Sequence, residues 1–286
     1  MSPFSIGFDI RMIRHTGIGT YIRELLSSMV EWGVAKRHKL AFFGGEPLPY
    51  VPKEISQLAF RSAIYSIGEQ LEYPVHLERC RLWHSPHYNI PWNKKKTRLV
   101  ATVHDLIHWI FRGRFFNSVQ GFYAGAMLRR AVRECDHIIA VSERTRNDLL
   151  RHFHADPDKV SVIHESVNEC FRKLPPDAIE SVRIKYRLPE SFFLYLGSLK
   201  PHKNVLWLAR IYQKLRAQKK IHSSLVLVGR KDRRYPKGFE DLASVEKMNS
   251  GIFYLPEVEY GDTIALYSAF ALIAAVVFGT LSVHPF

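Results

Sequence analysis

The chain has 286 residues, 47% of them hydrophobic, which is enough to bury one large core or two ordinary cores and excludes a disordered protein. Its 41 basic and 27 acidic residues give a net charge of +14, which suits an anionic ligand, a nucleic acid or an anionic membrane surface. The three cysteines, Cys80, Cys135 and Cys170, are an odd and widely spaced set that indicates neither a disulfide framework nor a zinc site and favours a reducing compartment.

The start of the chain carries no basic leader before a long apolar run, because Asp9 and Arg11 interrupt the apolar stretch early. No segment reaches about 18 consecutive apolar residues. We therefore expect no signal peptide, no membrane span and a cytoplasmic location. The sequence contains no recognisable nucleic-acid-binding module, so we expect no nucleic acid partner.

The first half of the chain alternates apolar strands with amphipathic helices. Strands are predicted at 6–10, 40–43, 137–141 and 159–163, with shorter apolar pieces at 82–84 and 99–104; helices are predicted at 20–32, around 122–132 and at 143–153. This alternation predicts a doubly wound α/β unit. We assign it to residues 1–172.

The second half repeats the same pattern after a segment, 173–177, that is typical of a linker. Strands are predicted at 192–196, 225–228 and 252–255, and helices at 204–217 and 262–270. We assign this second α/β unit to residues 178–286. Two such units facing each other place a ligand site in the cleft between them, at the carboxyl ends of the strands.

A basic loop in the second half is suited to a phosphate group. The buried strand at 192–196 ends in a turn with Gly197 and Ser198, and a helix follows Lys203. The free amides and the positive dipole end of that helix favour an anion, and Lys203 adds a full charge. This pattern predicts a diphosphate site.

A glycine-containing loop, 16–21, follows the first predicted strand and opens a helix. Gly17 and Gly19 allow a ligand to approach the backbone closely, and Thr20 and Tyr21 follow them. The alternative is a tight strand-to-helix turn with no ligand. The loop does not have the GxGxxG spacing, which argues against a dinucleotide cofactor.

Polar residues also follow other predicted strands. His104 comes at the end of the strand at 99–104, where an imidazole can bind a sugar hydroxyl or move a proton; a structural role is the alternative. Asp105 orients His104 or caps the next helix, and we favour the cap. The segment 84–89 also follows a strand but suits an ordinary turn equally well. Arg146 faces the cleft or solvent, and solvent is the preferred interpretation.

The segment 111–133 mixes aromatic residues with arginines. A helix of this composition can lie on an anionic membrane surface, such as the inner face of the cytoplasmic membrane. Equally, it can face the core with its arginines in solvent. Both interpretations stay open.

Taken together, these motifs resemble the retaining GT-B glycosyltransferases of family 4, particularly the bacterial mannosyltransferases of O-antigen and lipopolysaccharide biosynthesis. The resemblance covers about residues 5–270. Its elements are the segments 8–9, 16–21, 84–86, 102–106, 141–143, 195–204, 227–229 and 265–268. It implies two Rossmann-like domains.

The resemblance also implies an activity: retaining transfer of a hexose, with mannose from GDP-mannose the best match, from a nucleotide-diphosphate sugar to a polysaccharide or lipid-linked acceptor. It implies no metal and no other cofactor.

The resemblance further assigns roles to individual residues. Lys203 matches the lysine that neutralises the leaving diphosphate, beside Gly197 and Ser198, and His104 matches the histidine near the transferred sugar. Gly17 and Gly19 match the loop near the donor phosphate and the acceptor. The acceptor-side or supporting positions are Asp105, Thr20, Tyr21 and Arg146. Ser198 stands where many relatives carry an arginine.

The end of the chain departs from the family pattern. No acidic residue follows Asp262, so the paired glutamates that hold the donor in the family have no counterpart. We therefore expect a C-terminally truncated chain, through a frameshift or premature stop rather than a separately encoded remainder, with impaired activity, poor solubility and an open sheet edge. The alternatives are a non-catalytic nucleotide-sugar-binding or scaffold protein and a nucleotide-sugar epimerase.

Overall fold

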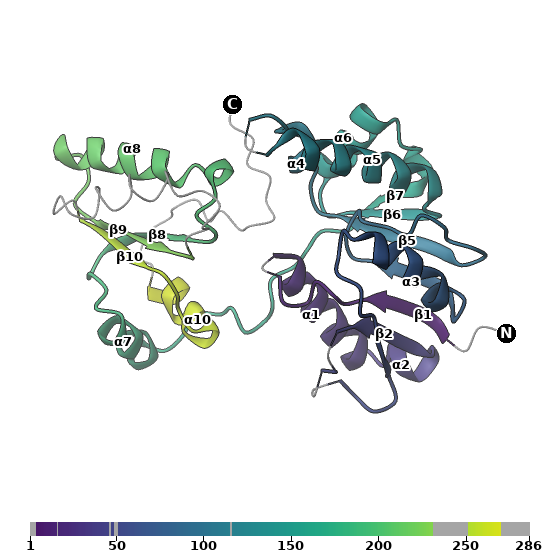
Figure 1. The fold of residues 1–286 in the computed structure, drawn as a ribbon. Helices are drawn as coiled ribbons and strands as arrows, with labels where there is room; N and C mark the ends of the chain where they lie inside the picture. Colours follow the sequence, from purple (N-terminus) through teal and green to yellow (C-terminus); the bar gives the residue numbers. More distant parts are fainter. Residues whose placement is uncertain are drawn as a thin grey trace. The chain divides into compact units, whose positions relative to one another are not determined.

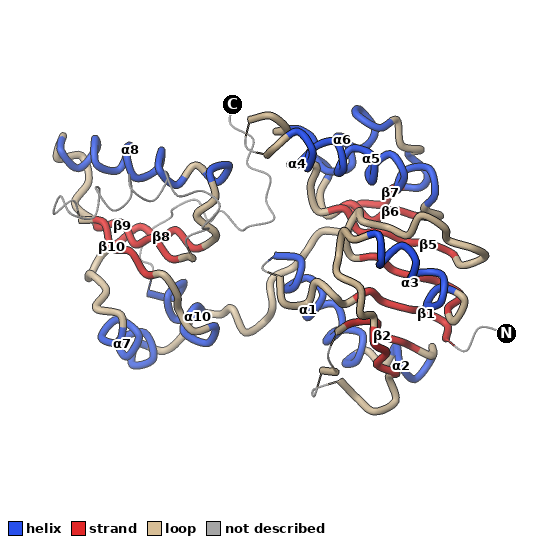
Figure 2. Tube along the Cα trace, in the orientation of Figure 1, coloured by secondary structure: helices blue, strands red, loops and turns tan. Residues whose placement is uncertain are grey.

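The protein is represented by a computed structural model that describes residues 4–15, 17–45, 47–48, 51–114, 116–230 and 251–269. The chain divides into two compact units, Met1–Ser166 and Val167–Phe286. Both are built from parallel strands and helices (Figures 1 and 2). This is the α/β architecture that the alternating pattern of the sequence predicts.

The first unit contains a parallel sheet of seven described strands in the order β3-β2-β1-β4-β5-β6-β7. The strands are β1 (Phe4–Asp9), β2 (Leu40–Gly44), β3 (Ser56–Ala59), β4 (Cys80–Ser85), β5 (Arg98–Val103), β6 (His137–Ala140) and β7 (Val160–Val162). The chain builds outward from β1 in one direction and then returns to build outward from β4 in the other. The switch point therefore lies between β1 and β4, which is where open α/β sheets bind ligands.

Both faces of this sheet are covered because its strands are apolar on both sides. Leu40 and Phe42 of β2 pack with α1, whereas Ala41 and Phe43 belong to the cluster on the opposite face. The described helices of the unit are α1 (Gly17–Glu31), α2 (Val34–Arg37), α3 (Ile67–Leu77), α4 (Ile107–Ile110), α5 (Ser118–Glu134) and α6 (Glu143–Phe153), with a 3-10 turn η1 (Pro157–Lys159).

The second unit contains a described parallel sheet of three strands in the order β10-β9-β8. Its elements are α7 (Pro176–Lys185), β8 (Phe192–Leu196), the 3-10 turn η2 (Pro201–Lys203), α8 (Val205–Ala217), β9 (Ser224–Val228), β10 (Ile252–Leu255) and α10 (Tyr260–Ala269). Figure 1 shows α8 on one face of these strands and α7 with α10 on the other. Leu225 and Leu227 lie in the cluster under α8, and Val226 and Val228 in the cluster under α7 and α10.

The expected linker at 173–177 is wrong at its last two positions. Pro176 and Asp177 form the first turn of α7, with Pro175 at the N-cap. Proline is tolerated there because the first amides of a helix have no intrahelical acceptor, so a missing N–H removes nothing. The boundary between the two units also falls earlier than the expected 172–178, after Ser166.

None of the described helices combines the length and the apolar composition that crossing a bilayer requires. The segment 270–286, on which the expected truncation and open sheet edge rest, lies outside the described residues.

Candidate functional site

Buried polar residues gather at the carboxyl ends of β1, β4 and β5. Asp9 ends β1, His84 and Ser85 end β4, Thr102 lies near the end of β5 and His104 follows it, and all five are buried. Parallel pairing of β1 with β4 and of β4 with β5 brings these ends to one edge of the sheet. Because buried polar side chains are costly unless they are paired, such a gathering at the switch point marks a candidate site.

His104 faces an oxygen atom of the protein at each of its ring nitrogens. Its side chain is buried, and Nε2 lies 3.0 Å from the carbonyl oxygen of Pro86. A carbonyl oxygen can only accept, so Nε2 carries the proton. Nδ1 lies 3.1 Å from Oε1 of Glu165, which is within ion-pair distance, yet Nδ1 makes no hydrogen bond within the described residues.

Tyr21 connects the start of α1 to this histidine. Its ring meets His104 edge-on at a centroid distance of 4.9 Å, and its hydroxyl lies 2.9 Å from Oγ1 of Thr102. Nε2 of His84 lies 2.8 Å from the same oxygen atom. Burial raises the pKa of Tyr21. Burial, with a smaller contribution from nearby His104, lowers the pKa of His84 to about 4. Tyr21, Thr102 and His84 therefore form a neutral hydrogen-bonded chain beside His104.

The glycine loop is constrained by the protein's own backbone. Gly17 begins α1, and a Cβ added to Gly19 would lie 2.4 Å from the carbonyl oxygen of Ile13. Any side chain at position 19 would therefore displace the loop that precedes the helix. Thr20 is exposed, and its hydroxyl accepts a hydrogen bond from Arg23. The tight strand-to-helix turn is sufficient to explain Gly19.

Asp105 and Arg146 make local contacts. Oδ1 of Asp105 accepts the amide of Ile107, the first residue of α4, at 3.0 Å, although the N-cap position itself is Leu106. Nε of Arg146, on α6, donates to the carbonyl oxygen of Val160 at 3.4 Å, and this side chain is half-buried. These contacts support the elements around the edge of the sheet.

Of the residues expected to bind diphosphate, Gly197, Ser198 and Lys203 lie together in the second unit, between β8 and α8, whereas Gly17 and Gly19 belong to α1 of the first unit. The amide of Gly197 donates to the carbonyl oxygen of Val228, and the hydroxyl of Tyr195 donates to the carbonyl oxygen of Ser198 at 2.9 Å. Lys203 ends η2 and is half-buried.

The helix that follows this loop starts without a side-chain cap. Asn204 precedes α8 in a left-handed conformation, with φ of 54°, and its side chain makes no cap hydrogen bond. The first amides of a helix have no intrahelical acceptor and lie at its positive dipole end. Without a side-chain cap, the start of α8 has the chemistry to bind an anion.

A buried ion-pair network that was not predicted from the sequence lies in the same unit as the His104 edge. The guanidinium group of Arg11 bonds Asp9 at 2.6 Å, Glu69 at 3.0 Å and the hydroxyl of Tyr73 at 2.9 Å. Burial is the largest single influence on Arg11 and lowers its pKa, but the Asp9 carboxylate together with Tyr73 and Glu69 outweighs burial and raises the pKa of Arg11. The network was not predicted because Glu69 and Tyr73 belong to α3, a helix that the apolar pattern did not reveal.

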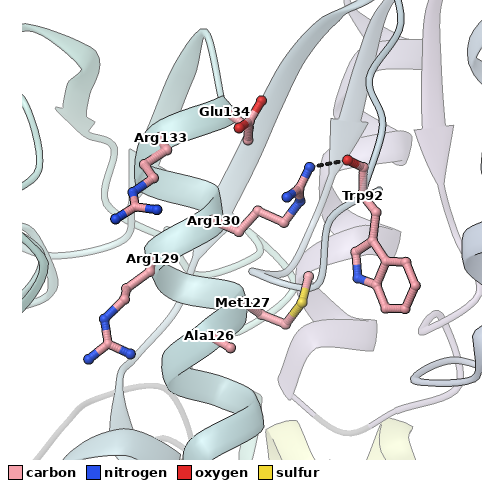
Figure 3. Close-up of a pocket in the computed structure, with 7 residues that line it drawn as sticks. All are labelled: Trp92, Ala126, Met127, Arg129, Arg130, Arg133 and Glu134. Atoms are coloured by element: carbon pink, nitrogen blue, oxygen red, sulfur yellow. Dashed lines mark hydrogen bonds between the residues drawn. The ribbon is translucent and has the colours of Figure 1, made fainter.

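A separate open groove of about 600 Å³ lies beside α5 (Figure 3). Its lining residues are Trp92, Ala126, Met127, Arg129, Arg130, Arg133 and Glu134. Arg130 donates to the carbonyl oxygens of Pro91 and Trp92, so it holds the loop that leads into β5 against the helix. The indole of Trp92 remains half-exposed. We call this the arginine groove.

Within the described residues, no group of three or more His, Cys, Asp or Glu side chains is arranged to hold a metal ion.

Comparison with known families and curated proteins finds several similar chains. Residues 15–169 match Glycosyltransferase Family 4. The chain is 25% identical over 211 residues to the O-antigen chain mannosyltransferase RfbU of Salmonella typhimurium, covering 73% of this chain and 54% of that protein. It is 24% identical over 282 residues to the O-antigen chain mannosyltransferase B of Escherichia coli, covering 89% and 71%. The chain thus spans about half the length of the first of these relatives.

Solved structures of glycosyltransferases have a similar fold. WaaG, a glycosyltransferase involved in lipopolysaccharide biosynthesis, superposes with a TM-score of 0.70 at 15% identity, covering 93% of this chain and 72% of that chain. HepE of Anabaena in complex with UDP and glucose gives a TM-score of 0.65 at 15% identity, with coverages of 93% and 72%. At this identity the likeness concerns the fold, which is GT-B.

Substitution of Gly19 tests the origin of the glycine loop. Gly19→Ala places a methyl group against the carbonyl of Ile13, so we expect a loss of about 1–3 kcal/mol in the free energy of unfolding. Gly45→Ala is the matched control, because a Cβ there meets nothing within 4 Å, and we expect a change below about 0.5 kcal/mol. Urea unfolding measures both. Equal stabilities of the two variants would contradict the close contact.

The low pKa of His84 predicts a loss of stability in acid. Between its unfolded value of about 6.5 and its folded value of about 4, the unfolded state binds more protons than the native state. The free energy of unfolding should therefore fall as the pH falls through this range, by at most about 1.4 kcal/mol per pH unit from this residue. His84→Gln keeps a polar group near Thr102 without titrating, so its pH dependence should be shallower. Parallel curves for the wild type and the variant would contradict the prediction.

Proposed function

The chain belongs to glycosyltransferase family 4, and we propose that it transfers a hexose from a nucleotide-diphosphate sugar to a polysaccharide or lipid-linked acceptor. The observation that carries this proposal is the family match over residues 15–169, which includes the His104 edge of the first unit. Mannose is the proposed sugar and O-antigen assembly the proposed setting, since two of the relatives are named O-antigen chain mannosyltransferases.

In this proposal the transferred sugar binds at the His104 edge. The imidazole is fixed by its bond to the Pro86 carbonyl and by contact with the ring of Tyr21. The ring is therefore already oriented, and binding a sugar costs little of its conformational entropy. Oε1 of Glu165 lies 3.1 Å from its Nδ1, so the imidazole and this partly exposed carboxylate together are the polar groups that a sugar hydroxyl meets at this edge. Asp105 accepts the first amide of α4 and so supports this edge.

The donor diphosphate is proposed to bind the β8–α8 loop of the second unit. Charge develops on the diphosphate as it leaves, and a lysine and oriented amides stabilise such charge without reorganising. Lys203 and the start of α8 supply these groups, with Gly197 and Ser198 forming the turn before them. We propose that this positive charge replaces a metal ion and that the anomeric configuration is retained. GDP is the proposed nucleotide for mannose; the UDP bound to HepE makes UDP the alternative to be tested.

Donor binding tests the second unit directly. We expect the purified chain to bind GDP-mannose, measured by isothermal titration calorimetry, and Lys203→Met to raise the Kd about tenfold through loss of a charge-assisted hydrogen bond. Lys214→Met, at the opposite end of α8, is the matched control and should leave the Kd unchanged. UDP-glucose is titrated in parallel to identify the base. Equal affinities of the Lys203 variant and the wild type would contradict the proposed diphosphate site.

Transfer itself requires a separate assay. Release of GDP in the presence of a mannose-terminated saccharide acceptor measures turnover, and proton NMR of the product reports its anomeric configuration. Retained configuration supports the proposed reaction. Donor binding without GDP release would support the non-catalytic nucleotide-sugar-binding protein instead.

We further propose that the arginine groove contacts an anionic membrane surface. The exposed face of α5 carries Val119 and Phe122 in its first half and Arg129 and Arg133 in its second half. Cationic side chains attract anionic lipid headgroups, and half-exposed aromatic rings such as Trp92 prefer the membrane interface. Arg130 holds Trp92 beside these charges.

Liposome binding tests this contact. We expect the protein to sediment with phosphatidylglycerol-containing vesicles at low salt and not with phosphatidylcholine vesicles. Arg129→Gln combined with Arg133→Gln should weaken binding about thirtyfold, since each charge near the surface contributes about 1 kcal/mol. The control Arg37→Gln with Lys39→Gln removes the same charge from an exposed site and should have little effect. Equal losses in both double variants would show a non-specific charge effect and contradict the proposal.

A further inference from the structure

A second, much smaller pocket lies at the switch point of the first unit. Its lining includes Asp9, Arg11, Met12, Ile64, His87 and Asn89, which come from the ends of β1 and β4 and from the segment before α3. The enclosed space is about 10 Å³, which is room for one water-sized group. A sugar ring or a phosphate group is too large for it, whereas a single hydroxyl group fits.

His87 presents a fixed donor in this pocket. Its Nδ1 lies 3.3 Å from the backbone nitrogen of Asn89. An amide N–H can only donate, so Nδ1 accepts and the neutral ring carries its proton on Nε2. His87 is only 7% exposed. Its Nε2 nevertheless has no hydrogen-bond partner among the described residues. Burial keeps the pKa of His87 well below its ordinary value, so the ring stays neutral.

The orientation of this ring is also fixed. His87 stacks on Tyr88 with a centroid distance of 3.8 Å, and the side chain of Asn89 is held between Glu69 at 2.8 Å and Tyr123 at 2.6 Å. The turn that carries His87 is therefore anchored on both sides. The donor at Nε2 is preorganised, which lowers the entropic cost of binding.

The charges around the pocket exclude an anionic ligand. Arg11 is neutralised by Asp9 at 2.6 Å and by Glu69 at 3.0 Å, so the two carboxylates outnumber the cation. A phosphate or carboxylate group would meet no excess positive charge here. A neutral hydroxyl group can instead accept a hydrogen bond from Nε2 of His87. It can donate its own proton to an oxygen atom of one of the residues that line the pocket.

The pocket adjoins the candidate catalytic edge. Pro86, which also lines it, provides the carbonyl oxygen that accepts the hydrogen bond of His104. We propose that this pocket binds one hydroxyl group of the acceptor saccharide and that the Nε2–H of His87 donates to its oxygen. The inference rests on the proposed function, because the saccharide is taken to be the acceptor of the proposed transfer reaction. His87 is thus a positioning residue for the acceptor.

Saccharide binding to the full chain tests this inference without turnover. Methyl α-D-mannopyranoside is titrated while the imidazole nitrogens are observed by long-range proton–nitrogen NMR, and we expect the His87 Nε2 signal to shift. His87→Asn places an oxygen where Nδ1 accepts the Asn89 amide but removes the Nε2 donor. It should raise the Kd about tenfold. His87→Gln places an amide donor near the Nε2 position and should restore most of the affinity. Circular dichroism checks that both variants are folded.

A deoxy series identifies the bound hydroxyl group. The 2-, 3-, 4- and 6-deoxy forms of the mannoside are compared on the wild type and on His87→Asn. We expect one deoxy sugar to bind the wild type about tenfold more weakly and to show no further loss with the variant, since the same hydrogen bond is already absent.

Three results would overturn the inference. They are equal saccharide affinities of the wild type and His87→Asn, losses that are the same for every deoxy sugar, and a shift of His87 caused by inorganic phosphate. The first would mean that the pocket holds only water, and the third that its ligand is an anion. Because these assays measure binding alone, an absence of GDP release contradicts the proposed transferase and leaves the saccharide site standing.

Discussion

The buried ion pair of Arg11 with Asp9 and Glu69 is the interaction on which the candidate site depends. It joins the end of β1 to α3, and through Asn89 and Tyr123 it reaches the turn after β4 and the helix α5. The ring of Phe60 lies 3.7 Å from the guanidinium carbon and excludes water from it. Removing one partner would leave an uncompensated charge in the interior, which costs about 3–5 kcal/mol. The network therefore fixes the positions of four elements around the switch point.

The sequence allowed much of the fold to be predicted and explains where the prediction failed. The strands β1, β2, β6, β8 and β9 are apolar runs because both faces of each sheet are covered, so the pattern was clear. The helix α3 was missed because it buries Glu69, Gln70 and His76 and contains Pro74. Those residues break the apolar period and resemble a loop, and only the tertiary partners of Glu69 make its burial favourable.

The residues of the candidate site, like the helices and strands, were predicted only in part from the sequence. His104 was found because a polar residue at the end of a buried strand stands out, but Glu165 follows β7 and reaches Nδ1 only through the strand order β5-β6-β7. His87 was seen as part of a turn, since its fixed tautomer depends on a contact with the Asn89 amide that sequence does not reveal.

Glycines illustrate the same limit. Gly19 avoids the carbonyl of Ile13, and Gly229 avoids that of Gly197, so close approach of backbone to backbone produces the pattern that a phosphate loop would also produce.

Both ring nitrogens of His104 already face oxygen atoms of the protein. The Nε2 proton is donated to the Pro86 carbonyl and cannot be offered to a ligand. Nδ1 is buried and lies 3.1 Å from Oε1 of Glu165. His87 is different, because its Nδ1 accepts the Asn89 amide and leaves the proton on Nε2. Of the two histidines, His87 is therefore the one whose ring can donate to a carbohydrate, whereas the ring of His104 is fixed between the backbone and a carboxylate.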